Sequence, residues 1–263
     1  MIRVGVLGAG GRMGRHVCQA VVDDPDLELV AAVDPQHAGI DLDQIGLHGT
    51  GLQVAAGPPA LADAEAEVAV DFTVIDAARS NLDWCADNGV HAVVGTTGFT
   101  ADDLDALRKR FADGVANAVI APNFAIGAVL MMRLAELAAP FFETAEVIEL
   151  HHDNKVDAPS GTAMMTVQRI ADASDTWAAD PTRTVVAEGA RGGAGAGGIR
   201  VHSLRIRGLV AHHEVVLGTT GQSLTIRHDS YDRTSYMPGV LLAIRRVRDQ
   251  PGLTVGLDTL LDL

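Results

Sequence analysis

The residues best suited to chemistry lie in the stretch ELHHDNKVDAPSGTA, residues 149–163. His151 and His152 stand side by side there, and Lys155 follows three residues later. An imidazole and an ammonium group can each donate a proton to a reacting atom. This combination of residue types therefore predicts a site of proton transfer.

The second half of the same stretch predicts a site for an anion. Residues 159–162, PSGT, have the composition of a helix start, because serine is a favoured N-cap residue. Exposed N–H groups, hydroxyls and the positive end of a helix bind carboxylates, and Lys155 adds a cation. Asp157 can orient Lys155 or one of the histidines, or it can cap the loop, and the sequence leaves these roles open.

The same histidines do not predict a metal site. Successive residues of a strand point to opposite faces, so His151 and His152 cannot easily bind one ion while the strand continues. The chain has no HExxH motif, and its two cysteines, Cys18 and Cys85, belong to no Cys/His cluster. We therefore expect no metal and interpret both cysteines as reduced core thiols of a cytoplasmic protein.

A glycine-rich turn follows the first apolar run of the chain, in RVGVLGAGGRMGRHV. Its glycines stand at positions 8, 10, 11 and 14, one residue away from the G-x-G-x-x-G spacing. Such a turn brings backbone N–H groups to a pyrophosphate at a helix N-terminus, although it can also be only a tight connection. Asp34 ends the next apolar run, twenty residues after Gly14, where an acidic residue binds the adenosine ribose. Together these features predict dinucleotide binding.

Two further segments, GTT at 95–97 and PNF at 122–124, each follow an apolar run. In open parallel sheets, ligands bind outside the carboxyl ends of the strands. We therefore expect both segments on the cofactor side, although each alone is also typical of an ordinary loop.

The first half of the chain alternates apolar runs with helix-like segments, which predicts an α/β fold with a doubly wound parallel sheet of the Rossmann type. The expected strands are 2–7, 29–33, 68–72, 92–94 and 118–121, and the expected helices are 12–22, 77–88 and 101–112.

After residue 124 the pattern changes, and we expect a second, α+β domain on a mixed or antiparallel sheet. Its elements are a helix at 125–142, strands at 146–151, 184–188, 199–207, 213–217 and 223–228, a hairpin connection at 218–221 and a final helix at 239–248. The glycine-rich residues 188–198 are interpreted as a flexible loop, with a lid over the ligand as the alternative.

Composition excludes some classes of partner. The 263 residues carry a net charge of −14 at pH 7 and are 48% hydrophobic, which fits two packed domains and argues against nucleic acid or an anionic membrane as partner. Arg133 and Glu136 interrupt the most apolar window, so we expect a buried helix there and no membrane span. The N-terminus predicts a strand rather than a signal peptide, in agreement with a cytoplasmic location.

The stretch 149–163 resembles the signature of the 4-hydroxy-tetrahydrodipicolinate reductases, also called dihydrodipicolinate reductases, of bacterial lysine and diaminopimelate biosynthesis. The resemblance extends over essentially the whole chain. GAGGRMG, VDFT at 70–73, GTTGF at 95–99, APNFAIG at 121–127 and RHDSYDRTSYMPGVLLA at 227–243 follow in the family's order.

The resemblance implies a dinucleotide-binding domain, residues 1–123 and 233–263, and a domain at 124–232 that binds substrate and forms a homotetramer. It implies that His151 and Lys155 donate protons. The implied substrate contacts are His152, Lys155, Ser160, Gly161 and Thr162. The implied cofactor contacts are Gly8, Ala9, Gly10, Gly11, Arg12, Met13, Asp34, Gly95, Thr96, Thr97, Ala121, Pro122, Asn123 and Phe124, with Arg233 and Tyr236 near the nicotinamide.

The implied activity is the NAD(P)H-dependent reduction of a cyclic imine dicarboxylate to tetrahydrodipicolinate. We expect NADH to be used at least as well as NADPH, because an ionised Asp34 repels a 2′-phosphate. The next three residues, PQH, lack the arginine that many relatives place there, although Arg12 can attract the phosphate from the other side. Another two-domain NAD(P)-dependent dehydrogenase, or a non-catalytic dinucleotide sensor, would share the glycine turn but would not need HHxxKxDAPSGT.

Overall fold

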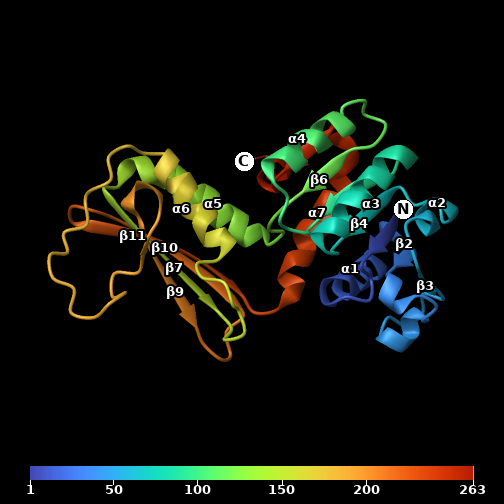
Figure 1. Ribbon diagram of the computed structural model, residues 1–263, viewed down its shortest axis with the longest axis horizontal. Coiled ribbons are helices and arrows are strands. Elements are labelled where there is room, and N and C mark those ends of the chain that lie inside the picture. The colour runs from blue at the N-terminus through green and yellow to red at the C-terminus, as the bar shows by residue number, and fades with distance from the viewer. Residues whose placement is uncertain (263) are drawn as a thin grey trace. The chain divides into compact units, whose positions relative to one another are not determined.

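The structure, a computed structural model, describes residues 1–262. The chain divides into two compact units (Figure 1). Met1–Phe124 and Tyr236–Leu263 form the first, and Ala125–Ser235 forms the second. Each unit contains its own sheet.

The first unit is built on a seven-stranded parallel sheet of order β12-β6-β5-β4-β1-β2-β3. Its strands are β1 (Ile2–Leu7), β2 (Leu27–Val33), β3 (Val54–Ala55), β4 (Val68–Asp71), β5 (His91–Val94), β6 (Ala118–Ile120) and β12 (Leu253–Val255). Its α-helices are α1 (Arg12–Val22), α2 (Pro59–Asp63), α3 (Ile75–Asn88), α4 (Ala101–Arg110) and α7 (Met237–Arg246). The chain winds outward from β1 in both directions, which confirms the predicted Rossmann-type sheet.

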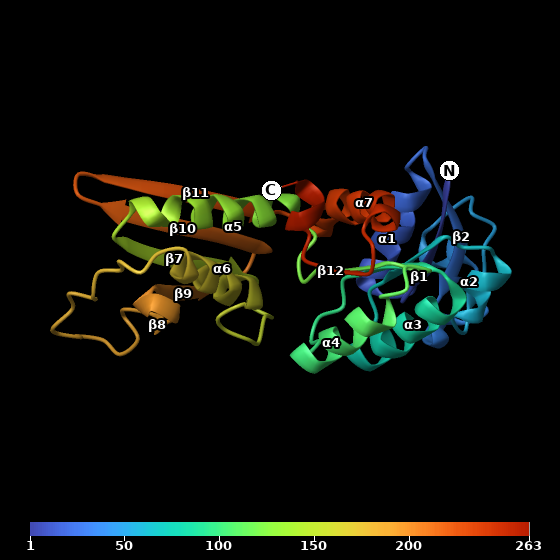
Figure 2. The ribbon, with the colours of Figure 1, turned by 90° about the horizontal axis from the view of Figure 1, so that it is seen from above.

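Helices cover both faces of this sheet: α1 and α7 lie on one face, and α3 and α4 lie on the other (Figure 2). The strands between them are accordingly apolar on both sides, since β4 is buried at every position and β1 at its last four. Each fully buried valine of these strands stabilises the fold by roughly 1.5–3 kcal/mol. The turns that follow β1, β4, β5 and β6 all emerge at the carboxyl edge of the sheet.

The second unit is built on a five-stranded sheet of order β11-β10-β7-β9-β8. Its strands are β7 (Thr144–His151), β8 (Gly193–Ala194), β9 (Arg200–Arg205), β10 (Ala211–Thr219) and β11 (Gln222–Ser230). The β7–β9 pair is parallel and the other pairs are antiparallel, which confirms the predicted mixed sheet. Helices α5 (Ile126–Ala138) and α6 (Gly161–Asp172) lie together on one face of it (Figure 2).

Some sequence-based predictions were wrong. No strand forms at 184–188, where Val185 and Val186 are 60% and 95% exposed. The β-branched side chains that suggested a strand find no neighbouring strand there, and strand propensity depends on such packing. The glycine-rich stretch 188–198 is not loop throughout, because β8 pairs with β9 at the edge of the sheet. The alternative role of this stretch as a lid stays untested.

Other differences are small. Strands β3, β8 and β12 and helix α2 were missed because two to five residues carry too little periodicity to recognise. The final helix begins at Met237, two residues before its predicted start, since Pro238 occupies its first turn. Within residues 1–262, no helix has the length and apolar character needed to span a membrane.

Candidate active site

The glycine turn connects β1 to α1 at the carboxyl edge of the first sheet. Gly14 packs against the start of this turn, since a Cβ at position 14 would lie 2.0 Å from the Gly8 carbonyl oxygen. Only glycine allows α1 to approach the turn this closely. Gly11 is the N-cap of α1, and no side chain caps the helix. The helix therefore begins with N–H groups and positive potential directed at the space beyond the turn.

The amides of the turn differ in their availability. Those of Gly8, Ala9, Gly10 and Gly11 all donate hydrogen bonds to other protein atoms, at 2.8–3.1 Å. The amides of Arg12 and Met13 have no such partner among residues 1–262. Of the six positions expected at the pyrophosphate, these two at the helix start are the ones whose amides remain for a phosphate oxygen.

Asp34 lies beside the turn and is only 8% exposed. One carboxylate oxygen, Oδ2, accepts the Gly10 amide at 3.1 Å, and the other, Oδ1, accepts the Gln36 amide at 3.0 Å. His37 Nδ1 lies 3.1 Å from Oδ1. These contacts fix the carboxylate at the edge of the turn, where the sequence predicted an acid for the ribose.

A second buried carboxylate, Asp71, links the ends of β4 and β5. It accepts hydrogen bonds from the Thr73 amide and hydroxyl at 2.8 and 2.7 Å, and from Asn81 Nδ2 at 2.7 Å. The Thr96 hydroxyl also donates to it, at 3.2 Å. Thr96 was expected to bind the cofactor, but it is buried, and its hydroxyl lies within hydrogen-bond distance of both Asp71 and the Thr73 carbonyl. Its neighbour Thr97 is exposed.

Aromatic packing holds together the next two segments that were expected at the cofactor. A Cβ at Gly95 would lie 2.1 Å from the ring of Phe72, so only glycine leaves room for this ring. Phe72 in turn contacts Phe124, with 5.8 Å between ring centroids. The Ala121 amide donates to the Val94 carbonyl at 3.0 Å, which joins the end of β6 to the end of β5. The predicted segments 95–97 and 121–124 are therefore neighbours at the carboxyl edge.

Arg233 and Tyr236 lie in a single 3-10 turn, Arg233–Tyr236, where the chain passes from the second unit back to the first. Arg233 is exposed, and Tyr236 is partly buried. Their role near the nicotinamide stays a prediction.

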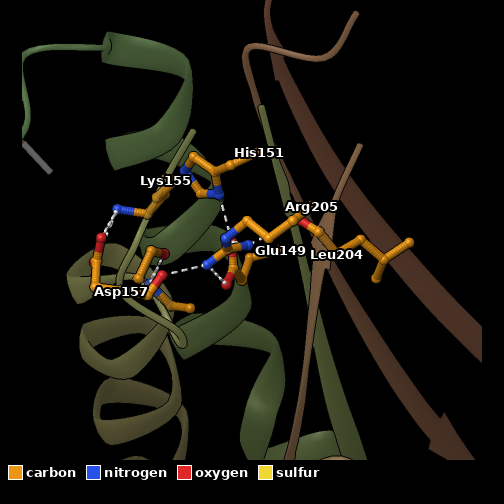
Figure 3. Close-up of polar contacts among 8 residues, drawn as sticks. Glu149, His151, Lys155, Asp157, Leu204 and Arg205 are labelled. Carbon is orange, nitrogen blue, oxygen red and sulfur yellow. Dashed lines mark hydrogen bonds and ion pairs between the residues drawn. The ribbon is translucent and has the colours of Figure 1, made fainter. Parts of the chain in front are cut away.

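The predicted proton donors lie in the second unit, at the end of β7 and in the short loop that leads to α6 (Figure 3). His151 is the last residue of β7. The chain then turns sharply, because the Lys155 amide donates to the His152 carbonyl at 3.2 Å. The loop ends at Ser160, the N-cap of α6.

A fully buried carboxylate lies beneath His151. Glu149 is 0% exposed, and its Oε2 accepts a hydrogen bond from His151 Nδ1. Arg205 of β9 donates to both carboxylate oxygens, from Nη1 to Oε2 at 3.0 Å and from Nη2 to Oε1 at 2.9 Å (Figure 3). Residues two apart on a strand share a face, which places Glu149 and His151 together.

Lys155 and Asp157 form an ion pair at the surface of the loop. Lys155 Nζ lies 2.8 Å from each oxygen of Asp157 (Figure 3). Of the roles that the sequence left open for Asp157, the structure favours orientation of Lys155. Arg205 also donates to the Asp157 carbonyl at 2.6 Å, so one guanidinium contacts both the strand carboxylate and the loop.

The start of α6 is suited to an anion. Ser160 Oγ accepts the Ala163 amide at 3.2 Å, and the first turn of the helix contains no acidic residue. Gly161 is exposed, and no atom lies within 4 Å of where its Cβ would be. His152 Nδ1 is buried without a hydrogen-bond partner among residues 1–262. With Lys155, these groups provide the cation, amides and donor expected around a carboxylate.

The environment shifts the pKa of several of these groups. Burial opposes ionisation of Glu149, but hydrogen bonds from Arg205, Ser203 and His151 outweigh it and hold the pKa of this carboxyl below its ordinary value. Burial lowers the pKa of His151; Glu149 opposes this shift, and Lys155 and Arg205 add to it. In the free protein, an ionised Glu149 therefore contacts an imidazole whose pKa is below its ordinary value.

Within residues 1–262, no group of three or more His, Cys, Asp or Glu side chains is arranged to bind a metal ion. Cys18 and Cys85 are buried and unpaired, and burial raises the pKa of each thiol to about 12. Such thiols are unreactive packing residues.

Sequence reasoning gave no role to four residues that shape these sites: Asp71, Phe72, Glu149 and Arg205. The period of two along β7 could have placed Glu149 beneath His151, since both lie inside the quoted signature. Nothing local identifies Arg205, because its position depends on the pairing of β9 with β7, which sets it opposite His151.

Comparison with known proteins shows the family of the chain. Residues 2–124 match the family "Dihydrodipicolinate reductase, N-terminus", and residues 127–261 match "Dihydrodipicolinate reductase, C-terminus". The chain is 53% identical to the 4-hydroxy-tetrahydrodipicolinate reductase of Nocardia farcinica, covering 100% of this chain and 99% of that protein. It is 49% identical to the enzyme of the same name from Mycobacterium marinum, with 100% of both chains covered.

A solved structure is similar over the whole length as well. The dipicolinate-bound dihydrodipicolinate reductase from Paenisporosarcina sp. TG-14 is 38% identical, with a TM-score of 0.88 over 98% of this chain and 99% of that one. Both halves of the sequence and the complete fold thus agree, and the chain belongs to the dihydrodipicolinate reductase family.

Proposed function

We propose that this protein reduces 4-hydroxy-tetrahydrodipicolinate to tetrahydrodipicolinate with a nicotinamide dinucleotide, as a step of lysine and diaminopimelate biosynthesis. The observation that carries this proposal is the arrangement in the second unit. His151 and Lys155, both able to donate protons, lie beside a helix start that is free of acidic side chains. Family membership supports the same reaction.

The first unit fits the cofactor. The amides of Arg12 and Met13 at the start of α1 would hold the pyrophosphate, and Asp34 would bind the adenosine ribose. Residues 95–97 and 121–124, with Arg233, would line the nicotinamide. When bound, the reduced nicotinamide supplies a hydride to the substrate ring.

The second unit would hold the substrate. His152, Lys155, Ser160, Gly161 and Thr162 would bind its two carboxylates, through one cation, one imidazole and the amides of the helix start. This local clamp is needed because the whole chain, at −14, repels an anion. A planar dicarboxylate held in this way cannot rotate away from the reducing group.

Reduction of a conjugated imine places negative charge on the ring, and a proton must neutralise it. Lys155 stabilises this charge as a cation, and Lys155 or His151 provides the proton. Two substrate carboxylates beside His151 would raise the pKa of the ring, opposing the effect of burial. Substrate binding would thus prepare the imidazole to act as an acid.

The decisive experiment is NADH oxidation, followed by absorbance, with the freshly made condensation product of pyruvate and aspartate semialdehyde. The proposal expects turnover with this mixture and none with either precursor alone. Oxidation with aspartate semialdehyde alone would indicate another dehydrogenase, and NADH binding without oxidation would indicate a sensor. We also propose, on the family resemblance, that the enzyme acts in the cytoplasm as a homotetramer.

A further inference from the structure

The buried carboxylate of Glu149 occupies a position where a strand residue is ordinarily apolar. Burial of a charge is costly unless hydrogen bonds compensate it, and Glu149 has three partners: Arg205, Ser203 and His151. His151 is itself a proposed proton donor, and Arg205 also contacts the loop that carries Lys155. Such an arrangement needs a reason beyond packing, since an apolar residue would fill the same space at less cost.

We propose that Glu149 is a positioning residue for both proton donors: it fixes the His151 ring directly and, through Arg205, it fixes the loop that carries Lys155. This inference rests on the proposed function for its meaning, because the two groups positioned are the proposed donors.

The first step concerns the His151 ring. A carboxylate can only accept hydrogen bonds, so Glu149 requires the proton of neutral His151 to be on Nδ1. Nε2 then carries the lone pair and points away from the carboxylate. This nitrogen can take up a proton and deliver it to substrate, while the ring is held in one orientation.

The second step concerns the loop. Arg205 Nη2 contacts Glu149 Oε1 at 2.9 Å and the Asp157 carbonyl at 2.6 Å. The Asp157 carboxylate in turn holds Lys155 Nζ at 2.8 Å. A guanidinium is planar and presents its donors in a rigid fork, so it transmits the position of Glu149 to the loop. The positions of the Lys155 ammonium and of the His151 imidazole thus both depend on Glu149.

The third step concerns charge. The groups that face His151 are Glu149 on its own strand, Arg205 on β9, Lys155 on the loop and His213 on β10. The negative charge of Glu149 favours the protonated ring, whereas the positive charges of Arg205 and Lys155 disfavour it. Removing the negative charge should therefore make His151 harder to protonate.

A natural control lies on the opposite face of the same strand. Glu146 also binds one arginine and one histidine: Arg191 Nη2 contacts its Oε1, and His202 Nε2 contacts its Oε2 at 2.7 Å. The chemistry of the two clusters is the same, but only the Glu149 cluster contacts a proposed proton donor. Glu149→Gln and Glu146→Gln therefore form a matched pair of variants.

The first test needs no substrate and no cofactor, and a variant serves only to assign the signal. In the complete chain labelled with 15N-histidine, the ring nitrogen shifts report the tautomer of His151, and His151→Asn assigns the signal. The inference expects the proton on Nδ1, and a neutral ring protonated on Nε2 overturns it. If the tautomer is as expected but the wild type lacks turnover, the proposed function fails and the positioning role of Glu149 does not.

The second test compares the two glutamine variants. Glu149→Gln should lower the pKa of His151 by about one unit, the lower end of the effect of a neighbouring opposite charge. The pH above which kcat/KM falls should move down with it, and kcat/KM should decrease about tenfold to a hundredfold through loss of alignment. Glu146→Gln should leave both the titration and the pH profile as in the wild type, with the oligomeric state checked by light scattering.

Arg205→Lys separates the two links. It keeps a cation near Glu149 but cannot hold Glu149 and the Asp157 carbonyl at once, so kcat should fall while the Nδ1 tautomer persists. Wild-type turnover in folded Glu149→Gln with an unshifted His151 titration overturns the proposal. Should Glu149→Gln not fold, Glu149→Asp retracts the carboxylate while keeping its charge, and unchanged turnover in that variant overturns the proposal equally.

Discussion

Asp34 Oδ2 accepts the backbone amide of Gly10 at 3.1 Å, so the acid at the end of β2 is built into the glycine turn itself. A carboxylate in this position binds ribose hydroxyls and repels a 2′-phosphate. The contact fixes the negative charge at one place, since Gln36 also donates to the same group at 3.0 Å. The carboxylate that a 2′-phosphate would approach is therefore held in place.

We expect NADH to be used at least as well as NADPH, measured as kcat/KM at fixed substrate concentration and ionic strength. One uncompensated charge contact is worth roughly 1.5–3 kcal/mol, or about one to two powers of ten. Arg12, exposed at the start of α1, can recover part of this by attracting the phosphate. Arg12→Ala should lower kcat/KM for NADPH more than for NADH, and Asp34→Asn should raise the relative use of NADPH. A clear preference of the wild type for NADPH would contradict this role of Asp34.

Lys155→Ala should reduce turnover by roughly two to four powers of ten, the usual contribution of a positioned proton donor. The fold should persist, because the side chain lies in a surface loop and forms its ion pair with the exposed Asp157. Lys109, the only other lysine of the chain, is exposed on α4 and provides the matched control. Lys109→Ala should leave turnover unchanged. Turnover of Lys155→Ala within a few-fold of the wild type would exclude Lys155 as the donor.

Pyridine-2,6-dicarboxylate should inhibit competitively with substrate. It is planar and carries two carboxylates, so it matches the cation and helix start of the proposed substrate site. The inhibition constant should rise by at least about tenfold in Lys155→Ala/Thr162→Val, since each lost charged hydrogen bond costs about 1.5–3 kcal/mol. Equal inhibition of the double variant and the wild type would place the binding site elsewhere.

The sequence predicted the architecture well because both sheets rest on long periodic segments. Strand β1 formed over its predicted apolar run and ended at the glycine turn, and helix α1 began directly after that turn. The predicted strand at 184–188 failed for the opposite reason: its pattern was local, and no neighbouring strand was available to pair with it.

The sites followed the same rule. His151, Lys155 and the α6 start could be located because they are close in sequence and share one signature. Arg205 could not, since only the register that pairs it with His151 shows that it binds Glu149. The inward hydroxyl of Thr96 was also invisible, because it depends on Asp71 at the end of a different strand. Long-range pairing therefore marks the limit of what local patterns reveal.

We expect a homotetramer, and the face of the second sheet that carries Ile148 and Val216 supports this. It has a cavity of about 410 Å³, lined in part by Ile148, Trp177 and Val216. Trp177 Nε1 and Arg200 Nε are buried there without hydrogen-bond partners among residues 1–262, and contacts from another copy could satisfy them. Light scattering at micromolar concentration should give four times the protomer mass, and Ile148→Asp should reduce it. A stable wild-type monomer would contradict the expectation.

The stability of the second unit should depend on pH through His213 of β10. This residue is 5% exposed, and burial lowers its pKa from 6.5 to about 4. Above pH 6.5 the ring is neutral in the folded and the unfolded chain, and it contributes no pH dependence. Between pH 6.5 and pH 4 the unfolded chain binds a proton that the folded chain refuses. Stability should therefore fall as the pH falls through this window.

The loss should approach about 3 kcal/mol at pH 4, because each unit of pKa difference corresponds to 1.36 kcal/mol. His213→Gln removes the titrating group and should give a flatter dependence than the wild type over the same range. His48→Gln, at a histidine whose side chain is 80% exposed, is the control and should follow the wild type.

Trp177 is the only tryptophan of the second unit, so urea unfolding in a Trp84→Phe background, at fixed protomer concentration, reports on this unit alone. Equal slopes for the wild type and His213→Gln between pH 6.5 and pH 4 would show that His213 is not the group responsible.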